Sequence, residues 1–159
     1  MIFVITGSQK FQFNRLLKKI DELKERKIIT EKIFAQTGYS SYVPQNYQFV
    51  DFMSKNSFMK MEEAADLVIT HGGTGAIIGA VKRGKRVIAV PRLEKYGEHV
   101  DDHQIQLVEE FDRMGIIRGC FELDRLGEIY STIYETRMVP YVSNTDNIIR
   151  SIEQFLEEI

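Results

Sequence analysis

Cysteine, long apolar runs and an excess of either charge are what this sequence has least of. Its single cysteine, Cys120, excludes an internal disulfide and fits a reducing cytoplasm. No apolar run approaches the roughly 18–20 residues that a membrane-spanning helix needs. The net charge of −2 gives no basic face of the kind that binds nucleic acid. These absences predict a globular protein of the cytoplasm.

Signs of a second domain or of a targeting segment are absent as well. The sequence has no internal repeat and no break in composition, so we predict a single domain over 1–159, long enough to bury a core. The first residues lack the basic stretch of a signal peptide and are predicted to form a buried strand.

A P-loop is excluded, because no Gly-Lys-Ser/Thr follows the glycine-rich stretch at 71–75.

Short apolar runs alternate with amphipathic segments along the chain. We predict strands at the apolar runs 2–6, 32–37, 47–52, 67–70, 87–90 and 116–117. We predict helices where apolar residues recur at helical spacing, around 13–23, at 58–65, at 74–83, from 101 or 102 to 114, at 124–136 and at 145–158. The alternation predicts an α/β fold of the Rossmann-like type, a parallel sheet with helices on both faces.

Small and polar residues follow four of the predicted strands. In a parallel sheet the carboxyl ends of the strands share one edge, and ligands bind outside that edge. We therefore expect one cleft formed by Thr6-Gly7-Ser8, Thr37-Gly38-Tyr39, His71-Gly72-Gly73 and Pro91-Arg92. The sequence allows two interpretations for each of two of these residues. Tyr39 fits packing better than stacking on a base, and Arg92 either binds phosphate or is a surface charge.

The most informative feature is a glycine-rich turn between a predicted strand and a predicted helix. The first turn of a helix leaves N–H groups unpaired, and its dipole favours an anion there, which glycines allow to approach closely. We predict a diphosphate site at His71, Gly72, Gly73, Thr74, Gly75 and Ala76, bound by the amides of 73–76 with help from His71 and Thr74. The alternative is a helix start in which Thr74 is the N-cap and the glycines serve packing.

Polar residues are concentrated in one segment of the C-terminal half, 91–104. Asp102, His103 and Gln104 offer the mixed donors and acceptors that sugar hydroxyls need, so with the glycine turn they predict a nucleotide-sugar pocket. The aspartates could instead only cap a helix. His99 and His103 stand at i and i+4 and could bind a metal, although no third ligand is evident from the sequence. Nothing near Cys120 indicates an activated thiol.

These motifs resemble the C-terminal, donor-binding half of a glycosyltransferase B fold, of the MurG-like family 28 type. The resemblance covers nearly the whole chain and is carried mainly by the segments 36–40, 69–75 and 97–104. It is nearest to the small soluble subunits of two-part bacterial exopolysaccharide glycosyltransferases (PssE/EpsF type). Two departures stand out. Gly79 occupies the position of a ribose-binding glutamate in larger members, and the loop 8–12 differs from that of similar subunits.

The resemblance implies an enzyme, a UDP-sugar-dependent hexosyltransferase that inverts the anomeric centre. It would move a hexose or N-acetylhexosamine to a lipid-linked saccharide in polysaccharide synthesis. Residues 71–76 would hold the UDP diphosphate. The uridine and sugar would be bound by Gly7, Gly38, Tyr39, Arg92, Asp102, His103 and Gln104.

The same resemblance implies a partner, because the chain supplies only one half of such an enzyme. That partner would be a membrane-associated, acceptor-binding subunit that recruits the chain to the inner face of the membrane. The general base would lie on the partner or be Glu98 or His99. No Asp-x-Asp occurs, so we expect no metal or other cofactor. The alternatives are a non-catalytic nucleotide-sugar-binding accessory subunit and a Rossmann-like interaction module.

Overall fold

The computed structural model describes residues 1–143, and within them six parallel strands form one sheet in the order β3-β2-β1-β4-β5-β6. The strands are β1 (Ile2–Ile5), β2 (Ile33–Gln36), β3 (Gln48–Val50), β4 (Leu67–His71), β5 (Arg86–Val90) and β6 (Arg118–Gly119). The helices are α1 (Asn14–Glu25), α2 (Lys55–Ala64), α3 (Thr74–Lys82), α4 (His103–Arg113) and α5 (Leu126–Thr132), with 3₁₀ turns η1 (Glu94–Tyr96) and η2 (Leu123–Arg125).

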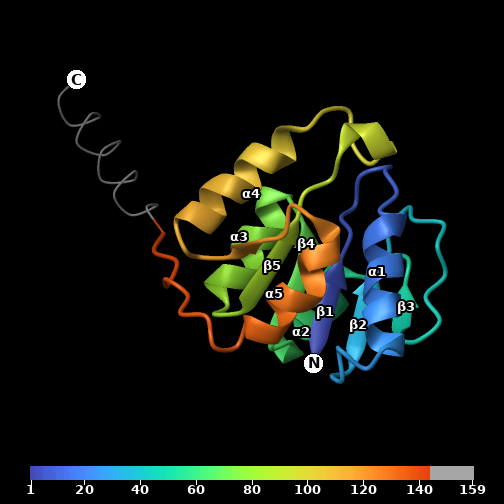
Figure 1. The fold of residues 1–159 in the computed structure, drawn as a ribbon, viewed down its shortest axis with the longest axis horizontal. Helices are drawn as coiled ribbons and strands as arrows, with labels where there is room; N and C mark the ends of the chain where they lie inside the picture. The colour runs from blue at the N-terminus through green and yellow to red at the C-terminus, as the bar shows by residue number, and fades with distance from the viewer. Residues whose placement is uncertain (144–159) are drawn as a thin grey trace.

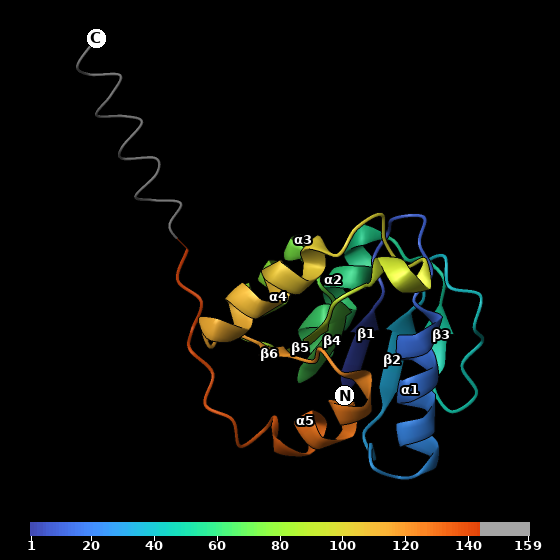
Figure 2. The ribbon, with the colours of Figure 1, turned by 45° about the horizontal axis from the view of Figure 1, so that its top comes forward.

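The helices cover both faces of the sheet because the strand side chains alternate between two cores. On β1, Ile2 and Val4 pack with α1 and α5, whereas Phe3 and Ile5 pack with α2, α3 and α4. Figures 1 and 2 show these two layers, with α1 and α5 on one side of the sheet. Every residue of β1 is buried, as expected of a parallel strand covered on both faces. The predicted fold class is confirmed.

The order of the strands places a topological switch point beside β1. From β1 the chain adds β2 and β3 on one side, and then crosses over to build β4, β5 and β6 on the other. The loops after β1 and β4 therefore diverge from the carboxyl edge. In open parallel sheets the crevice between two such loops is the usual place for a ligand.

Three predicted elements near the C-terminus differ from the structure or lie outside it. Residues 116–117 do not form a strand; Ile117 is fully buried in the core beside α3 and α4, and the strand follows at β6. This segment is apolar because it fills the core, rather than because it pairs in the sheet. The helix expected at 124–136 is shorter and follows a 3₁₀ turn. The helix expected at 145–158 lies outside the described residues.

The start of α2 differs from the prediction, whereas α3 begins at Thr74 as predicted. α2 begins at Lys55, because the hydroxyl of Ser54 caps it by accepting a hydrogen bond from the amide of Ser57. α3 begins at Thr74 with Gly73 as the N-cap, so Thr74 is not the cap. Within residues 1–143, none of the helices is long and apolar enough to cross a membrane.

Candidate functional site: a cavity at the switch point

A cavity of about 730 Å³ opens at the carboxyl edge, between the loops after β1 and β4. All six residues of the glycine-rich segment 71–76 line it, and so do Gly7, Ser8 and Gln9 after β1. The size is in the range of small-molecule sites, about 300–1,000 Å³. The cavity lies at the sheet edge that the sequence predicted, but of the four expected loop segments only the two after β1 and β4 line it.

The N-terminus of α3 makes this cavity suitable for an anion. Within the described chain, no side chain caps the helix, so the amides of its first turn are left for solvent or a ligand. The helix dipole adds partial positive charge there. The ammonium-bearing Lys55 lines the cavity, while no aspartate or glutamate among residues 1–143 does. Amides, dipole and lysine together favour a phosphate group.

His71 fills the space between the two loops. A Cβ atom added at Gly73 would lie 2.2 Å from its Nε2 atom, and one added at Gly7 would lie 2.9 Å from the same atom. A side chain at either position would therefore displace the imidazole of His71 from the place that it occupies. Burial, followed by the charge of Arg92, lowers the pKa of His71 to about 4. The ring is therefore neutral at pH 7 and adds no charge to the anion site.

Gln104 holds the glycine-rich turn in place. Its Oε1 atom accepts hydrogen bonds from the amide of Gly72 at 3.1 Å and from the amide of Arg92 at 3.0 Å. The residue is buried and lines the cavity. α4 lies so close that a Cβ atom at Gly72 would come within 2.8 Å of the Cβ of Gln104. The oxygen predicted to contact sugar is therefore already bound to backbone amides.

Arg92 is neither a surface charge nor part of the cavity wall. It is 1% exposed, and its Nη2 atom donates to the carbonyl oxygens of Thr6 and Phe11. Burial lowers its pKa to about 10, so the guanidinium remains charged at neutral pH. Arg92 therefore fastens the loop after β5 to the loop after β1, which corrects the predicted contact with a ligand.

Glu98 is fully buried and paired, so it is not placed to act as a general base. Its Oε1 atom lies 2.7 Å from Nε of Arg15, and its Oε2 atom accepts from the amide of Leu93 at 3.0 Å. It does not line the cavity, whereas His99, the other predicted base, does. The carboxylate of Glu98 stabilises the loop that carries His99.

Three more predicted ligand residues lie outside the cavity wall. Asp102 is at the N-cap position of α4, but its side chain accepts from the amide of Glu94 at 2.8 Å. Gly38 packs on the carbonyl of Gly7, where a Cβ atom would come within 2.7 Å of the oxygen. Tyr39 makes an edge-on contact with the ring of Phe52, as its packing alternative implied. Of the predicted uridine and sugar residues, only Gly7, His103 and Gln104 line the cavity.

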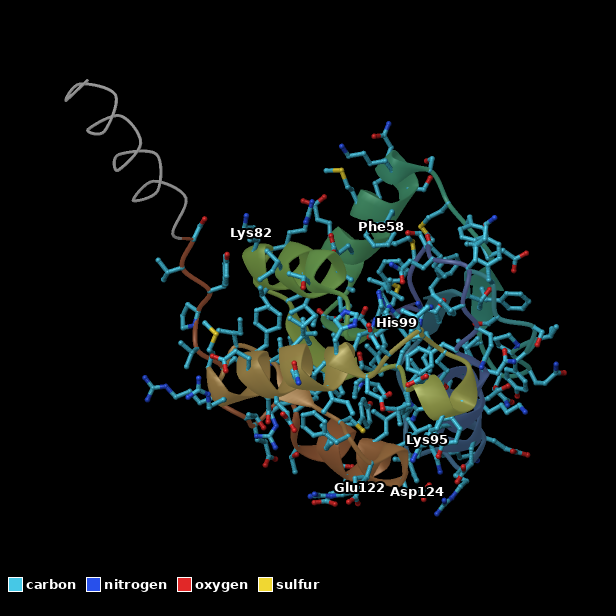
Figure 3. The ribbon with its side chains drawn as sticks, turned by 90° about the horizontal axis from the view of Figure 1, so that it is seen from above. Phe58, Lys82, Lys95, His99, Glu122 and Asp124 are labelled. Atoms are coloured by element: carbon cyan, nitrogen blue, oxygen red, sulfur yellow. The ribbon has the colours of Figure 1, made fainter. Side chains whose placement is uncertain are left out.

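Sequence reasoning missed the wall on the α2 side, where Met53, Lys55 and Phe58 line the cavity. The ring of Phe58 also packs edge-on against Phe3 in the core, with centroids 5.2 Å apart. Seen from above, Phe58 on α2 and His99 before α4 lie on different sides of the site (Figure 3). A signal was present, because Met53 and Lys55 follow a predicted strand at the same sheet edge.

Gly79 lies beside a carboxylate of another helix, with room for a Cβ atom at ordinary contact distance. A Cβ atom at Gly79 would lie 3.4 Å from Oε1 of Glu62, a buried carboxylate of α2 that pairs with Arg83 at 2.9 Å. Burial raises the pKa of Glu62. Glu62 does not line the cavity, so it is not placed to bind a ribose there. Burial likewise raises the pKa of Cys120 to about 11, in agreement with a structural thiol.

A family model for the glycosyltransferase family 28 C-terminal domain matches residues 1–159. The chain belongs to this family. Its relatives include the UDP-N-acetylglucosamine transferase subunit ALG13 of Candida albicans, 26% identical over 110 residues, and that of Homo sapiens, 28% identical over 109 residues. The matches cover 69% and 65% of this chain. They span 32% and 9% of those relatives, so the chain corresponds to about a third of one and a tenth of the other.

Solved structures of glycosyltransferases share the fold. An NMR structure of ALG13 superposes with a TM-score of 0.62 at 20% identity, covering 94% of this chain and 92% of that one. MurG of Acinetobacter baumannii superposes with a TM-score of 0.60 at 19% identity, covering 84% of this chain and 40% of MurG. These likenesses confirm the architecture as the C-terminal, Rossmann-like half of a glycosyltransferase B fold.

Proposed function

We propose that this chain is the donor-binding subunit of an inverting glycosyltransferase, which moves a hexose or N-acetylhexosamine from a UDP-sugar to a lipid-linked saccharide. The observation that carries the proposal is that residues 71–76, at the uncapped start of α3, all line one cavity at the switch point. Membership of glycosyltransferase family 28 supports the same chemistry. The setting we propose is exopolysaccharide synthesis, in the cytoplasm at the inner face of the membrane.

The two walls of the cavity differ in a way that suits the two ends of a UDP-sugar. On the α2 side, Met53 and Phe58 offer apolar surface for a flat base, and Lys55 offers a charge for the phosphates. On the α4 side, His103 and the Nε2 group of Gln104, whose Oε1 atom is bound to backbone amides, offer polar groups to a sugar. We propose that the diphosphate bridges these walls on the amides of α3.

Transfer would proceed by displacement of UDP by an acceptor hydroxyl. Negative charge grows on the departing diphosphate, and the preorganised amides of α3 would stabilise it in the transition state. The sequence contains no Asp-x-Asp, so we propose that no divalent metal or other cofactor takes part in this step. The general base is His99, which lines the cavity, or a group on the partner.

A partner is part of the proposal, because the chain matches one half of a glycosyltransferase B fold. The relatives from Candida albicans and Homo sapiens are themselves named as subunits of a transferase. In the segment that precedes α4, Tyr96 is 51% exposed and Val100 is 67% exposed. We propose that they contribute to the surface on which a membrane-associated, acceptor-binding subunit docks.

The experiment that tests this function is a panel of UDP-sugars, first in binding and then in turnover. The purified chain should bind UDP and one or more UDP-sugars but transfer little sugar by itself. Transfer to a lipid-linked acceptor should appear on addition of the co-expressed partner and should survive EDTA. Full transfer by the isolated chain would contradict the need for a partner, and absence of UDP binding would contradict the whole proposal.

A nucleotide-sugar-binding accessory subunit without catalytic activity is the second candidate. One observation favours it. Among residues 1–143, the cavity wall contains no carboxylate that could act as a base, and Glu98 is paired with Arg15. Such a subunit would bind UDP-sugars, yet the complex with its partner would show the same turnover when His99 is replaced by glutamine. A large loss of turnover in that variant would support the catalytic assignment.

A further inference from the structure

The three histidines of this chain gather at one place. His71, His99 and His103 are all the histidines it has, and all of them line the cavity. The Nδ1 atom of His71 faces the hydroxyl of Thr70 at 3.3 Å. The other two histidines meet Asp101 at the rim, where the loop leads into α4.

Three potential metal-binding atoms converge in this cluster. The Nδ1 atom of His99 lies 3.2 Å from Oδ1 of Asp101, and the Nδ1 atom of His103 contacts the same oxygen. One ligand atom from each of the three residues lies within 4.8 Å of the ligand atoms of the other two. Atoms bound to a tetrahedral zinc ion at about 2.1 Å are separated from each other by roughly 3.4 Å. Small side-chain movements would therefore enclose such an ion.

We propose that His99, Asp101 and His103 form a binding site for a divalent transition-metal ion of the zinc class. Two imidazole nitrogens and a carboxylate oxygen are a donor set that such ions favour, whereas Mg²⁺ and Mn²⁺ prefer oxygen ligands. Three protein ligands leave the fourth tetrahedral position open to water or to a ligand in the cavity.

The surroundings hold these groups in position. His99 is 8% exposed, and its ring lies against that of Phe11, with centroids 5.3 Å apart. Asp101 accepts a hydrogen bond from the backbone amide of His103 at 3.1 Å, so the first turn of α4 orients the carboxylate. Asp101 and His103 have exposed side chains, which gives a hydrated ion a path to the cluster. The neighbouring Asp102 points to the amide of Glu94 instead.

This site goes beyond the proposed transfer and does not rest on it, so it can be measured without UDP or a partner. A zinc ion bound to His99 would occupy the imidazole named above as a general base, so in the zinc-bound state that base would lie on the partner. The full chain, prepared without a histidine tag and freed of metal by a chelator, would be titrated with ZnCl₂ by calorimetry. We expect one saturable site for Zn²⁺ and none for Mg²⁺ over the same concentrations. The imidazole NMR signals of His99 and His103 should shift, and those of His71 should stay in place.

A matched pair of variants locates the site. Asp101→Asn should weaken zinc binding by about 10-fold or more, since loss of even an outer-shell partner costs about 10–100-fold. Asp102→Asn removes the same charge one residue away and should bind zinc as the unchanged chain does, with circular dichroism confirming that both variants are folded. The proposal is overturned if zinc binds only at millimolar concentration, if the signals of His99 and His103 do not move, or if both variants lose affinity equally.

Discussion

The two segments that form the cavity, 71–76 and 91–104, use their polar groups in opposite ways. In the described chain the first leaves the amides of a helix uncapped at the cavity wall. In the second segment, three buried polar side chains bind other parts of the protein. Arg92 binds the loop after β1, Glu98 pairs with Arg15, and Gln104 binds the amides of Gly72 and Arg92.

This difference shows that the polar side chains of 91–104 mainly hold the turn 71–76 in position. A side chain with buried hydrogen bonds already made cannot turn to a ligand without leaving its partners unsatisfied. The amides at the start of a helix have no competing partner inside the helix. Substitutions in 91–104 should therefore lower the stability of the fold, and substitutions in 71–76 should weaken ligand binding.

The largest effect on stability is expected for Glu98→Ala. Removing this buried carboxylate leaves the guanidinium of Arg15 without its ion pair and should lower the free energy of unfolding by about 3–4 kcal/mol. Glu94→Ala in the same loop removes an exposed carboxylate and should change it by less than about 0.5 kcal/mol. Urea unfolding measures both. Equal stabilities would show that the Glu98 ion pair does not hold the loop.

Gln104→Ala should act on both segments at once. It leaves the buried amides of Gly72 and Arg92 without an acceptor, which should cost about 2–3 kcal/mol of stability. Because Gly72 belongs to the turn, affinity for UDP should fall too. Asp102→Ala, which frees only the exposed amide of Glu94, should cost about 1 kcal/mol or less and leave UDP affinity unchanged. Urea unfolding and calorimetry with UDP on both variants measure these effects. Unchanged stability and unchanged UDP affinity in Gln104→Ala would contradict the role of Gln104 in holding the turn.

The buried neutral His71 predicts a pH dependence of stability. Its folded pKa of about 4 is below the unfolded value, so the unfolded chain binds a proton first as the pH falls. The His71 contribution is present above pH 6.5 and is lost between pH 6.5 and 4, by about 2–3 kcal/mol. His71→Gln should remove this part of the acid sensitivity. Unfolding curves at pH 7, 5.5 and 4 would show whether the variant loses less stability on acidification than the unchanged chain, and equal losses would contradict the role of His71.

The sequence predicted the fold and the principal segment of the site because both depend on local patterns. Alternating apolar runs predict the strands and helices, and a glycine-rich turn between a strand and a helix marks a segment at the carboxyl edge of the sheet. The partners of Glu98 and Arg92 could not be predicted in this way, because Arg15 and Thr6 lie more than 80 residues away along the chain. Burial of these charges is decided by that long-range pairing and not by their neighbours.

Local sequence patterns also could not predict that Asp101 joins His99 and His103 in one cluster. At i and i+4, His99 and His103 suggest neighbours on one helix, but His99 lies in the loop before α4. The path of that loop is what brings Asp101 between them as a third group. Likewise, Met53 and Phe58 reach the cavity because α2 starts at the carboxyl edge of the sheet, earlier than its apolar spacing suggested.

The most direct test of the account is UDP calorimetry on Gly75→Ala and Gly79→Ala. Both replace a glycine of α3 and should each stabilise the helix by up to about 1 kcal/mol. A methyl group at Gly75 has no protein atom within 4 Å and stands at the cavity wall, while Gly79 does not line the cavity. We predict that Gly75→Ala weakens UDP binding by roughly 1–2 kcal/mol, about the value of an anion's contact with a helix N-terminus. Gly79→Ala should bind UDP normally, and equal affinity in the two variants would contradict a diphosphate on the 71–76 turn.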